Sequence, residues 1–199
     1  SKGISTAVYH ATLDNDGSMR SAIAAMDIFD ALNDKFIRSL EPLFYKSPLC
    51  IFDTNIHQSG ITEIVRLCKK HNVKTMVDTV SIPKSIKLVN SGVLKHIDII
   101  TPNKDELQAI VRAIDKNQEP CSIEKGINFL LDYGIKCVIV SVGSKGVYWG
   151  SKDSRQVKHV PSEKVDSIVN VTGAGDCLSG GIAYALLNGI KEEESIKIG

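Results

Sequence analysis

The sequence of 199 residues lacks the features that mark several large classes of protein. No apolar run approaches the roughly 20 residues that a membrane-spanning helix needs, and we recognise no signal peptide at its start. A formal net charge of +1 leaves no basic surplus to favour nucleic acid. Internal repeats and low-complexity segments are missing too. With 43% hydrophobic residues, the chain has enough apolar material for one α/β domain with its own core.

The cysteines do not have the spacing of a disulfide framework or a metal site. Their number is odd, they are widely scattered, and no two are spaced as C-x-x-C. They are Cys50, Cys68, Cys121, Cys137 and Cys177. Most lie inside apolar runs, as buried thiols do. The pattern argues against a disulfide scaffold or a zinc site and predicts a protein of the reducing cytoplasm.

From Pro48 onward, predicted strands alternate with predicted helices. The strands are Pro48–Asp53, Lys74–Val80, His96–Pro102 and Lys136–Gly143, followed by an antiparallel pair, Gly146–Gly150 and Arg155–Pro161. The helices are Gly60–Asn72, Ile82–Gly92, Asn103–Lys116, Ser122–Tyr133 and a long helix from Gly173. This alternation predicts a mostly parallel sheet, and the nearly continuous apolar strands indicate helices on both of its faces. We expect residues 31–199 to form one such domain.

The opening of the chain follows a different pattern. Residues Thr6–Leu13 alternate in polarity, Asp14–Gly17 is a turn sequence, and Met19–Ile28 continues as an extended segment. This arrangement predicts a β-hairpin, and we expect residues 1–30 to form a small β lid on the α/β domain. The chain begins almost directly in a strand pattern and stops inside a helical one. We therefore expect it to be an incomplete domain, cut at both ends.

The stretch NVTGAGDCLSGG, residues 170–181, places an aspartate behind three small residues in the first turn of an apolar helix. The amides of Gly173, Ala174 and Gly175 at a helix N-terminus would make an anion site, and Asp176 beside them could take a proton from a hydroxyl. The alternative is helix capping, because an acidic side chain in a first turn gains about 0.3–1 kcal/mol from the helix dipole. The stretch is not a Walker loop, since no G-K-[ST] follows.

Two further stretches follow predicted strands, where ligands bind in sheets of this kind. In TPNKDEL, Asn103 and Glu106 share a helix face and could organise the water shell of Mg²⁺, or they could simply form a capping box. In VSVGSKGVYW, Ser141, Gly143 and Gly146 could let the backbone approach a flat ligand, or they could form a plain turn. We expect Asp53, Asp78, Asn103 and Gly143 to meet at one edge of the sheet.

Together these stretches resemble the ribokinase-like (PfkB) family of sugar and nucleoside kinases. The signature D/N-x-T-G-A-G-D matches from Asn170 to Asp176, NKDE matches the family's N-x-x-E motif, and VGSKGV matches its nucleotide turn. One departure is Leu178, where the family usually has Phe. The family's first signature, a Gly-Gly-Asn segment, and its final helices are missing. The resemblance implies a three-layer α/β/α sandwich and covers nearly all of the chain.

Within the family, the opening STAVYHATLDNDGSMRSAIAAMDIFDALN and the segments DTNI and VDTVSIPKSIKL resemble the pseudouridine kinase group. This resemblance implies phosphorylation of the 5′-hydroxyl of pseudouridine by ATP and Mg²⁺, with a monovalent cation as a further candidate. It makes Asp176 the base and the amides of Gly173–Asp176 the anion hole. The other implied roles are Mg²⁺ and phosphate binding by Asn103 and Glu106, nucleotide binding by Thr172, Ser141, Gly143 and Gly146, and substrate or phosphate contacts by Asn55 and Lys84.

Three alternatives stay open: a related kinase that acts on adenosine or ribose, a non-catalytic nucleotide-binding domain, and a plain solvated position for Lys84. A dinucleotide-binding dehydrogenase is excluded because no G-x-G-x-x-G follows a strand. By analogy with related kinases, the lid is expected to pair two subunits, and the parent chain is a candidate for fusion to a pseudouridine-phosphate glycosidase. The expected partner is a small nucleoside or sugar.

Overall fold

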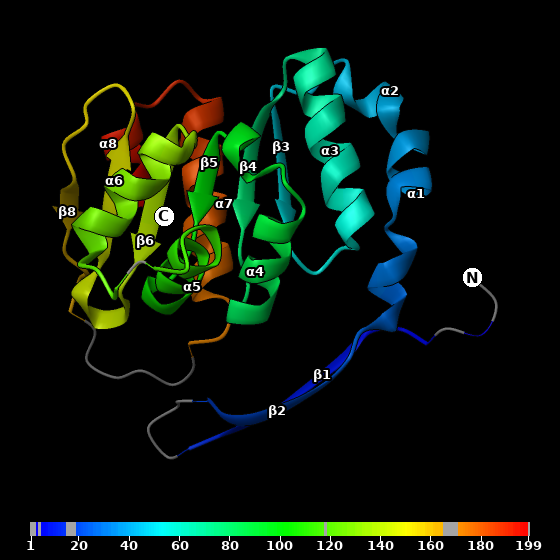
Figure 1. The fold of residues 1–199 in the computed structure, drawn as a ribbon, viewed down its shortest axis with the longest axis horizontal. Helices are drawn as coiled ribbons and strands as arrows, with labels where there is room; N and C mark the ends of the chain where they lie inside the picture. The colour runs from blue at the N-terminus through cyan, green and yellow to red at the C-terminus, as the bar shows by residue number, and fades with distance from the viewer. Residues whose placement is uncertain (1–2, 4, 15–18, 118, 165–170, 199) are drawn as a thin grey trace.

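The structure, a computed structural model, describes residues 3, 5–14, 19–117, 119–164 and 171–198. It contains two sheets (Figure 1). A small antiparallel sheet consists of β1 (Val8–Leu13) and β2 (Met19–Ala25), which confirms the predicted hairpin. A sheet of six strands forms the body, in the order β3-β4-β5-β6-β7-β8, which is also their order along the chain.

The first four strands of the large sheet are parallel, and the last two are antiparallel to their neighbours. The strands are β3 (Leu49–Asp53), β4 (Lys74–Asp78), β5 (Ile99–Thr101), β6 (Cys137–Ser141), β7 (Val147–Ser151) and β8 (Lys158–Val160). The prediction of a mostly parallel sheet is therefore confirmed. Because each parallel strand is added on the same side of the last one, right-handed crossovers place the connecting helices on one face.

Helices cover both faces of the large sheet (Figure 1). The helices on the crossover face are α3 (Gln58–His71), α4 (Ile82–Asn90), α5 (Lys104–Ile114) and α6 (Ile123–Tyr133). On the opposite face lie α7 (Ala174–Leu187) and α8 (Glu192–Ile198). The expected three-layer α/β/α arrangement is thus present. Within the described ranges, no helix is long and apolar enough to cross a membrane.

Each central strand buries both of its faces. In β4, Met76 and Val77 are both fully buried, but Met76 packs with the residues of α7 and α8 whereas Val77 packs with the core beneath α3 to α6. Ile99 and Ile100 of β5 divide between the two cores in the same way. This explains why consecutive residues in the middle of these strands are apolar. The edge strand β3 differs, because Phe52 is buried against the crossover helices while Ile51 on the other face is 49% exposed.

The hairpin of β1 and β2 projects from the body and lies beyond one end of the large sheet (Figure 1). Its apolar side chains are exposed on both strands, including Val8, Tyr9 and Ile23. The predicted second strand is too long, since β2 ends at Ala25 and the 3₁₀ helix η1 (Asp27–Ala31) follows. Most of the predicted turn lies outside the described residues.

Two short helices that the sequence pattern did not predict follow the hairpin. They are α1 (Asp34–Ser39), which Asn33 caps through its side chain, and α2 (Glu41–Phe44). Both pack against α3, and the carboxylate of Glu63 joins α3 to Arg38 of α1 at 3.0 Å. Two predicted strands are shorter than expected. Strand β5 begins only after the 3₁₀ helix η2 (Leu94–His96), and strand β8 spans only Lys158–Val160.

Candidate active site

The carboxyl ends of the parallel strands bring the expected polar residues to one edge. Asp53 is paired in register with Asp78, and Asp78 with Thr101. Asn103, two residues beyond β5, forms an isolated parallel bridge with Ser141 at the end of β6. Backbone pairing alone therefore places the ends of β3, β4, β5 and β6 side by side, as expected for ligand-binding edges of such sheets.

Helix α7 begins at this edge. Its N-cap residue is Gly173, with φ +84° and no side-chain cap. Ala174, Gly175 and Asp176 form the exposed first turn. A Cβ atom placed on Gly175 would lie 3.9 Å from Oδ2 of Asp78, so the start of α7 lies directly against the end of β4. Asn170, the first residue of the signature stretch, lies outside the described residues.

Carboxylates gather where α7 meets the strand ends. Burial raises the pKa of Asp78, and a hydrogen bond from the Val80 N–H to its Oδ1, at 2.8 Å, opposes that rise. Three neighbouring carboxylates raise it further: Glu106, Asp176 and Asp53. This concentration of negative charge favours a bound cation. Among the described residues, no group of three or more His, Cys, Asp or Glu side chains is placed to hold a metal ion directly.

Asn103 and Glu106 form the capping box that the sequence allowed. Oδ1 of Asn103 accepts from the N–H groups of Asp105 and Glu106, both at 2.9 Å. Oε2 of Glu106 accepts from Asn103 N–H at 2.9 Å and from the buried Thr79 hydroxyl at 2.6 Å. Both of these hydrogen bonds therefore fall on the same oxygen of the Glu106 carboxylate. The capping role is established, and it orients Glu106 and the amide nitrogen of Asn103 at the edge.

The sequence VDTVS, which supplies Thr79, also contains a strained residue. Val80 has φ +61°, a conformation that is a genuine outlier for a β-branched side chain. Its N–H is held by Asp78 Oδ1, and Ser81 N–H bonds to Thr79 O at 2.6 Å, so a tight turn follows β4 directly. Strain of this kind costs about 1–3 kcal/mol and gathers at functional sites. Neither Thr79 nor Val80 was among the residues singled out from the sequence.

Asn55 and Lys84, far apart in sequence, meet at the same edge. Lys84 Nζ donates to Asn55 Oδ1, and Asn55 donates through its side-chain nitrogen to Asp53 at 2.5 Å. Lys84 is half-buried, so it is not a plain solvated helix charge. Nearby, Lys87 Nζ donates to the carbonyl of Ile56 at 2.7 Å, and burial together with the charge of Lys84 lowers the pKa of Lys87.

The turn after β6 contains the 3₁₀ helix η3 (Gly143–Lys145) and joins β6 to β7. A Cβ on Gly146, which has φ +85°, would lie 2.1 Å from Val160 O, so the turn needs glycine there to reach β8. The Ser162 hydroxyl bonds to Ser144 O at 2.6 Å and strengthens that junction. Gly143, by contrast, is exposed with open space around it. The exposed Thr172 precedes α7.

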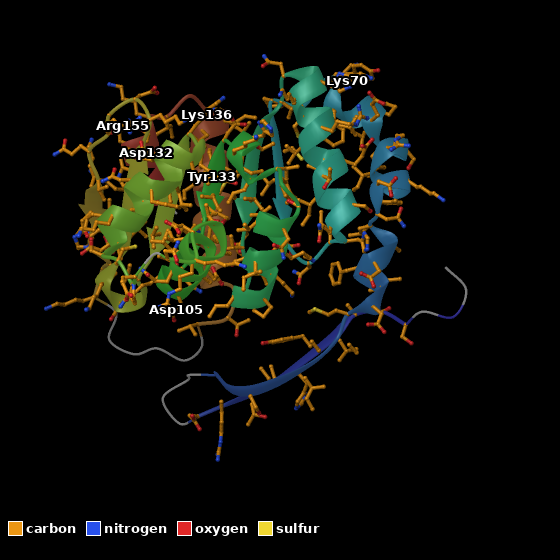
Figure 2. All side chains as sticks on the ribbon, viewed as in Figure 1. Lys70, Asp105, Asp132, Tyr133, Lys136 and Arg155 are labelled. Atoms are coloured by element: carbon orange, nitrogen blue, oxygen red, sulfur yellow. The ribbon has the colours of Figure 1, made fainter. Side chains whose placement is uncertain are left out.

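A cleft of about 490 Å³ lies elsewhere, at the amino ends of the strands. In Figure 2, Asp105 marks the carboxyl edge and Lys136 the amino edge, and the two lie at opposite ends of the sheet. None of the residues that line this cleft belongs to the candidate site.

Comparison with known proteins agrees with this geometry. The model of the pfkB family of carbohydrate kinases matches residues 1–199. The chain is 27% identical over 195 residues to pseudouridine kinase from Escherichia coli, covering 98% of the chain and 60% of that protein. It is 28% identical over 183 residues to ribokinase from Haemophilus influenzae, covering 92% and 56%.

The fold agrees with solved structures as well. The crystal structure of ribokinase from Thermotoga maritima superimposes with a TM-score of 0.80 at 27% identity, covering 96% of this chain and 59% of that one. The chain thus spans only about three fifths of the length of its relatives. The family match over the whole sequence shows that the chain belongs to the pfkB family of carbohydrate kinases.

Proposed function

We propose that this chain supplies the nucleotide-binding and catalytic part of a kinase that transfers the γ-phosphate of ATP to the 5′-hydroxyl of pseudouridine. The observation that carries the proposal is the start of α7. There an exposed Asp176 stands in a helix turn without a side-chain cap, against the carboxylate-bearing end of β4. Helix N-termini of this kind stabilise anions, and an exposed carboxylate beside one can act as a base.

In the proposed reaction, Asp176 accepts the proton of the substrate hydroxyl. The hydroxyl oxygen forms a bond to the γ-phosphorus, and the bond from that phosphorus to the bridging oxygen of ADP breaks. The amides of Gly173, Ala174 and Gly175 face the negative charge that spreads over the transferred phosphoryl oxygens. Catalysis of this kind depends on positioning and electrostatic stabilisation more than on covalent chemistry by the protein.

The residues at the strand ends fit Mg²⁺ and phosphate. Bound Mg²⁺ would neutralise charge on the phosphates during transfer. Glu106 would hold it through water, since only one of its oxygens is committed to the capping box and Thr79. Oδ1 of Asn103 already accepts two hydrogen bonds, so this side chain would serve through its amide nitrogen, as a donor to a phosphate oxygen. The gathered carboxylates also leave room for a monovalent cation as a further partner.

The remaining roles follow from position at the edge. Ser141, Gly143 and Thr172 would line the nucleotide site, and Gly146 would hold the turn against β8. Asn55 and Lys84 would contact the nucleoside or its phosphate. Residues 1–30 would act as a lid over this end of the sheet and pair with the lid of a second subunit in a homodimer. We place the protein in the cytoplasm, with a fused glycosidase domain as a candidate part of the parent chain.

The base is tested by Asp176→Asn in the full-length protein. We expect kcat to fall by about 10²–10⁴-fold, because proton transfer is lost, while ATP affinity stays nearly unchanged. Asp105→Asn is the matched control, since Asp105 is also an exposed aspartate in the first turn of a helix at this edge. Normal turnover by Asp176→Asn would show that the base is wrongly assigned.

The substrate is tested separately, with ATP, Mg²⁺ and a panel of pseudouridine, uridine, adenosine and ribose. Ribose is the second candidate, because the similarity to a ribokinase is as high as that to a pseudouridine kinase. Preferential phosphorylation of pseudouridine would support the full proposal. Preference for another panel member would keep the role of Asp176 and replace the substrate. Silence across the panel with ATP still bound would favour a non-catalytic nucleotide-binding domain.

A further inference from the structure

The cleft of about 490 Å³ lies at the end of the sheet that the proposed reaction does not use. Residues from five segments line it: Pro48 just before β3, the last turns of α3, the residues from Asn72 to Thr75 at the start of β4, the stretch from Lys95 to Asp98, and the stretch around Lys136. Its volume is within the range of small-molecule sites. Apolar side chains of Pro48, Val65 and Val73 contribute to its walls.

Cationic side chains dominate the rim. Lys69, Lys74, Lys95 and Lys136 all line the cleft, and His96 stands beside them. The only carboxylate in the lining is that of Asp98. Within the described ranges, the ammonium groups of Lys69, Lys74 and Lys95 have no carboxylate within 4.0 Å.

Asp98 is already committed to the protein. It accepts from Thr75 through both N–H and hydroxyl, at 2.8 and 2.9 Å, and from Lys136 Nζ at 2.6 Å. Burial opposes its ionisation, but these hydrogen bonds outweigh burial and hold the pKa of Asp98 below its usual value. The carboxylate therefore balances Lys136 and leaves the other lysines without a counter-charge.

Helix dipoles explain part of this arrangement. Lys69 lies in the last turn of α3, and Lys95 in the last turn of η2, where positive side chains are favourable. That explanation does not apply to Lys74, which opens a strand, and it does not explain why the positive charges surround a hollow. Like charges around one hollow repel one another, and a bound anion would offset that repulsion.

We infer that this cleft is a second binding site, for a small phosphorylated molecule whose phosphate lies among Lys69, Lys74 and Lys95. The organic part would rest on the apolar wall of Pro48, Val65 and Val73. Lysine ammonium groups bind phosphate as point charges, and a partly enclosed cleft reduces the screening of those charges by water. The site is separate from the proposed catalytic edge, because it lies at the other end of the same strands (Figure 2).

His96 reports on occupancy of the cleft. Burial lowers its pKa, and the positive charges of Lys69 and Lys95 lower it further. The other charged groups in the lining are Lys74, Lys136 and Asp98. A bound phosphate would offset the lysine charges and favour the imidazolium form. The pKa of His96 should therefore rise on binding, and binding should strengthen as the pH falls toward that pKa.

The test is a titration of the full-length protein with inorganic phosphate and with ribose 5-phosphate at constant ionic strength. The pKa of His96 is followed by NMR of its ring protons, assigned with His96→Gln. We expect both anions to raise this pKa, and ribose 5-phosphate to bind more tightly because it also covers the apolar wall. Since the signal comes from His96, binding at the catalytic edge does not mimic it.

Lys69→Gln/Lys95→Gln should weaken this binding about tenfold or more, and it should raise the pKa of His96 in the free protein. The matched control is Lys35→Gln/Lys125→Gln, two exposed lysines outside the cleft, which should leave affinity unchanged. The inference is overturned if neither anion moves the His96 pKa. It is also overturned if the control loses as much affinity as the cleft variant, because net charge would then explain the binding.

Discussion

Two glycines with nearly the same positive φ have opposite structural surroundings, and replacing each by alanine separates their roles. Gly146 has φ +85° and Gly173 has φ +84°. A Cβ on Gly146 would lie 2.1 Å from Val160 O and 2.6 Å from Ser162 N, whereas a Cβ on Gly173 would meet no atom within 4 Å. Gly173, with ψ −2°, lies in the left-handed region, whereas Gly146, with ψ −143°, lies in a region that side chains other than glycine rarely adopt. Alanine at Gly146 therefore meets both steric overlap and the larger backbone strain.

The expected magnitudes follow from these distances. A left-handed φ costs alanine about 1–2 kcal/mol, and the lower entropy of the unfolded chain returns roughly 0.4–1 kcal/mol. Gly173→Ala should therefore cost about 1 kcal/mol of unfolding free energy. Gly146→Ala adds a backbone displacement of nearly 1 Å at the end of β8, and overpacking of this kind costs about 1–3 kcal/mol more. Because the ψ of Gly146 is also less favourable for alanine than that of Gly173, we expect a total loss of at least about 3 kcal/mol.

Urea denaturation followed by circular dichroism measures both losses on the full-length protein. Kinetics add an independent readout for Gly173→Ala, because its amide belongs to the proposed anion hole. We expect kcat to fall by about tenfold or more even where the variant is fully folded. Losses of stability that agree within about 0.5 kcal/mol would refute the steric argument at β8. An unchanged kcat in Gly173→Ala would refute the need for a left-handed residue at the start of α7.

Three further predictions concern stability. Val80→Gly should stabilise the protein by about 1 kcal/mol in thermal unfolding, because it relieves the strained φ of +61°; a loss of stability would contradict this. The pKa of Asp78 is raised in the folded state, so its contribution to stability is largest at low pH and is lost as the pH rises through the folded pKa. Asp78→Asn should therefore flatten the pH dependence of stability above pH 4, and an unchanged profile would count against it. The pKa of Glu63 is lowered to about 2, chiefly by a hydrogen bond from Arg66, while burial opposes the shift and Arg38 adds to it. The contribution of Glu63 to folding stability is therefore present above the unfolded pKa and is lost as the pH falls toward 2. Glu63→Gln should cost about 2 kcal/mol at pH 7 and nothing near pH 2, measured by urea denaturation at both pH values.

Local sequence determined the regular part of the fold. Strands such as Lys74–Asp78 could be predicted because a strand buried on both faces has consecutive apolar residues at its centre, here Met76 and Val77. Helix α3 could be predicted because its apolar residues recur on one face. The capping box of Asn103 and Glu106 could also be anticipated, since its partners are only three residues apart. The start of α7 could be anticipated as well, because it lies within one short signature.

Short elements could not be predicted, because neighbours distant in sequence stabilise them. Helices α1 and α2 have too few turns to be stable alone, and they form because Ile37 and Phe44 are buried and Arg38 reaches Glu63 on α3. The strained turn at Val80 has no sequence signal, since valine is an unfavourable choice for its φ.

The sequence by itself determined the family, the alternation of strands and helices, and the identity of the residues at the carboxyl edge. Only the tertiary structure decided how those residues meet. Lys84 reaches Asn55 across 29 positions, and Gly175 lies against Asp78 across nearly 100. It also decided that Gly146 serves the contact with β8, and that lysines from separate elements surround one cleft. The physical reason is that local patterns record burial and backbone conformation, whereas packing between distant segments sets distances between side chains.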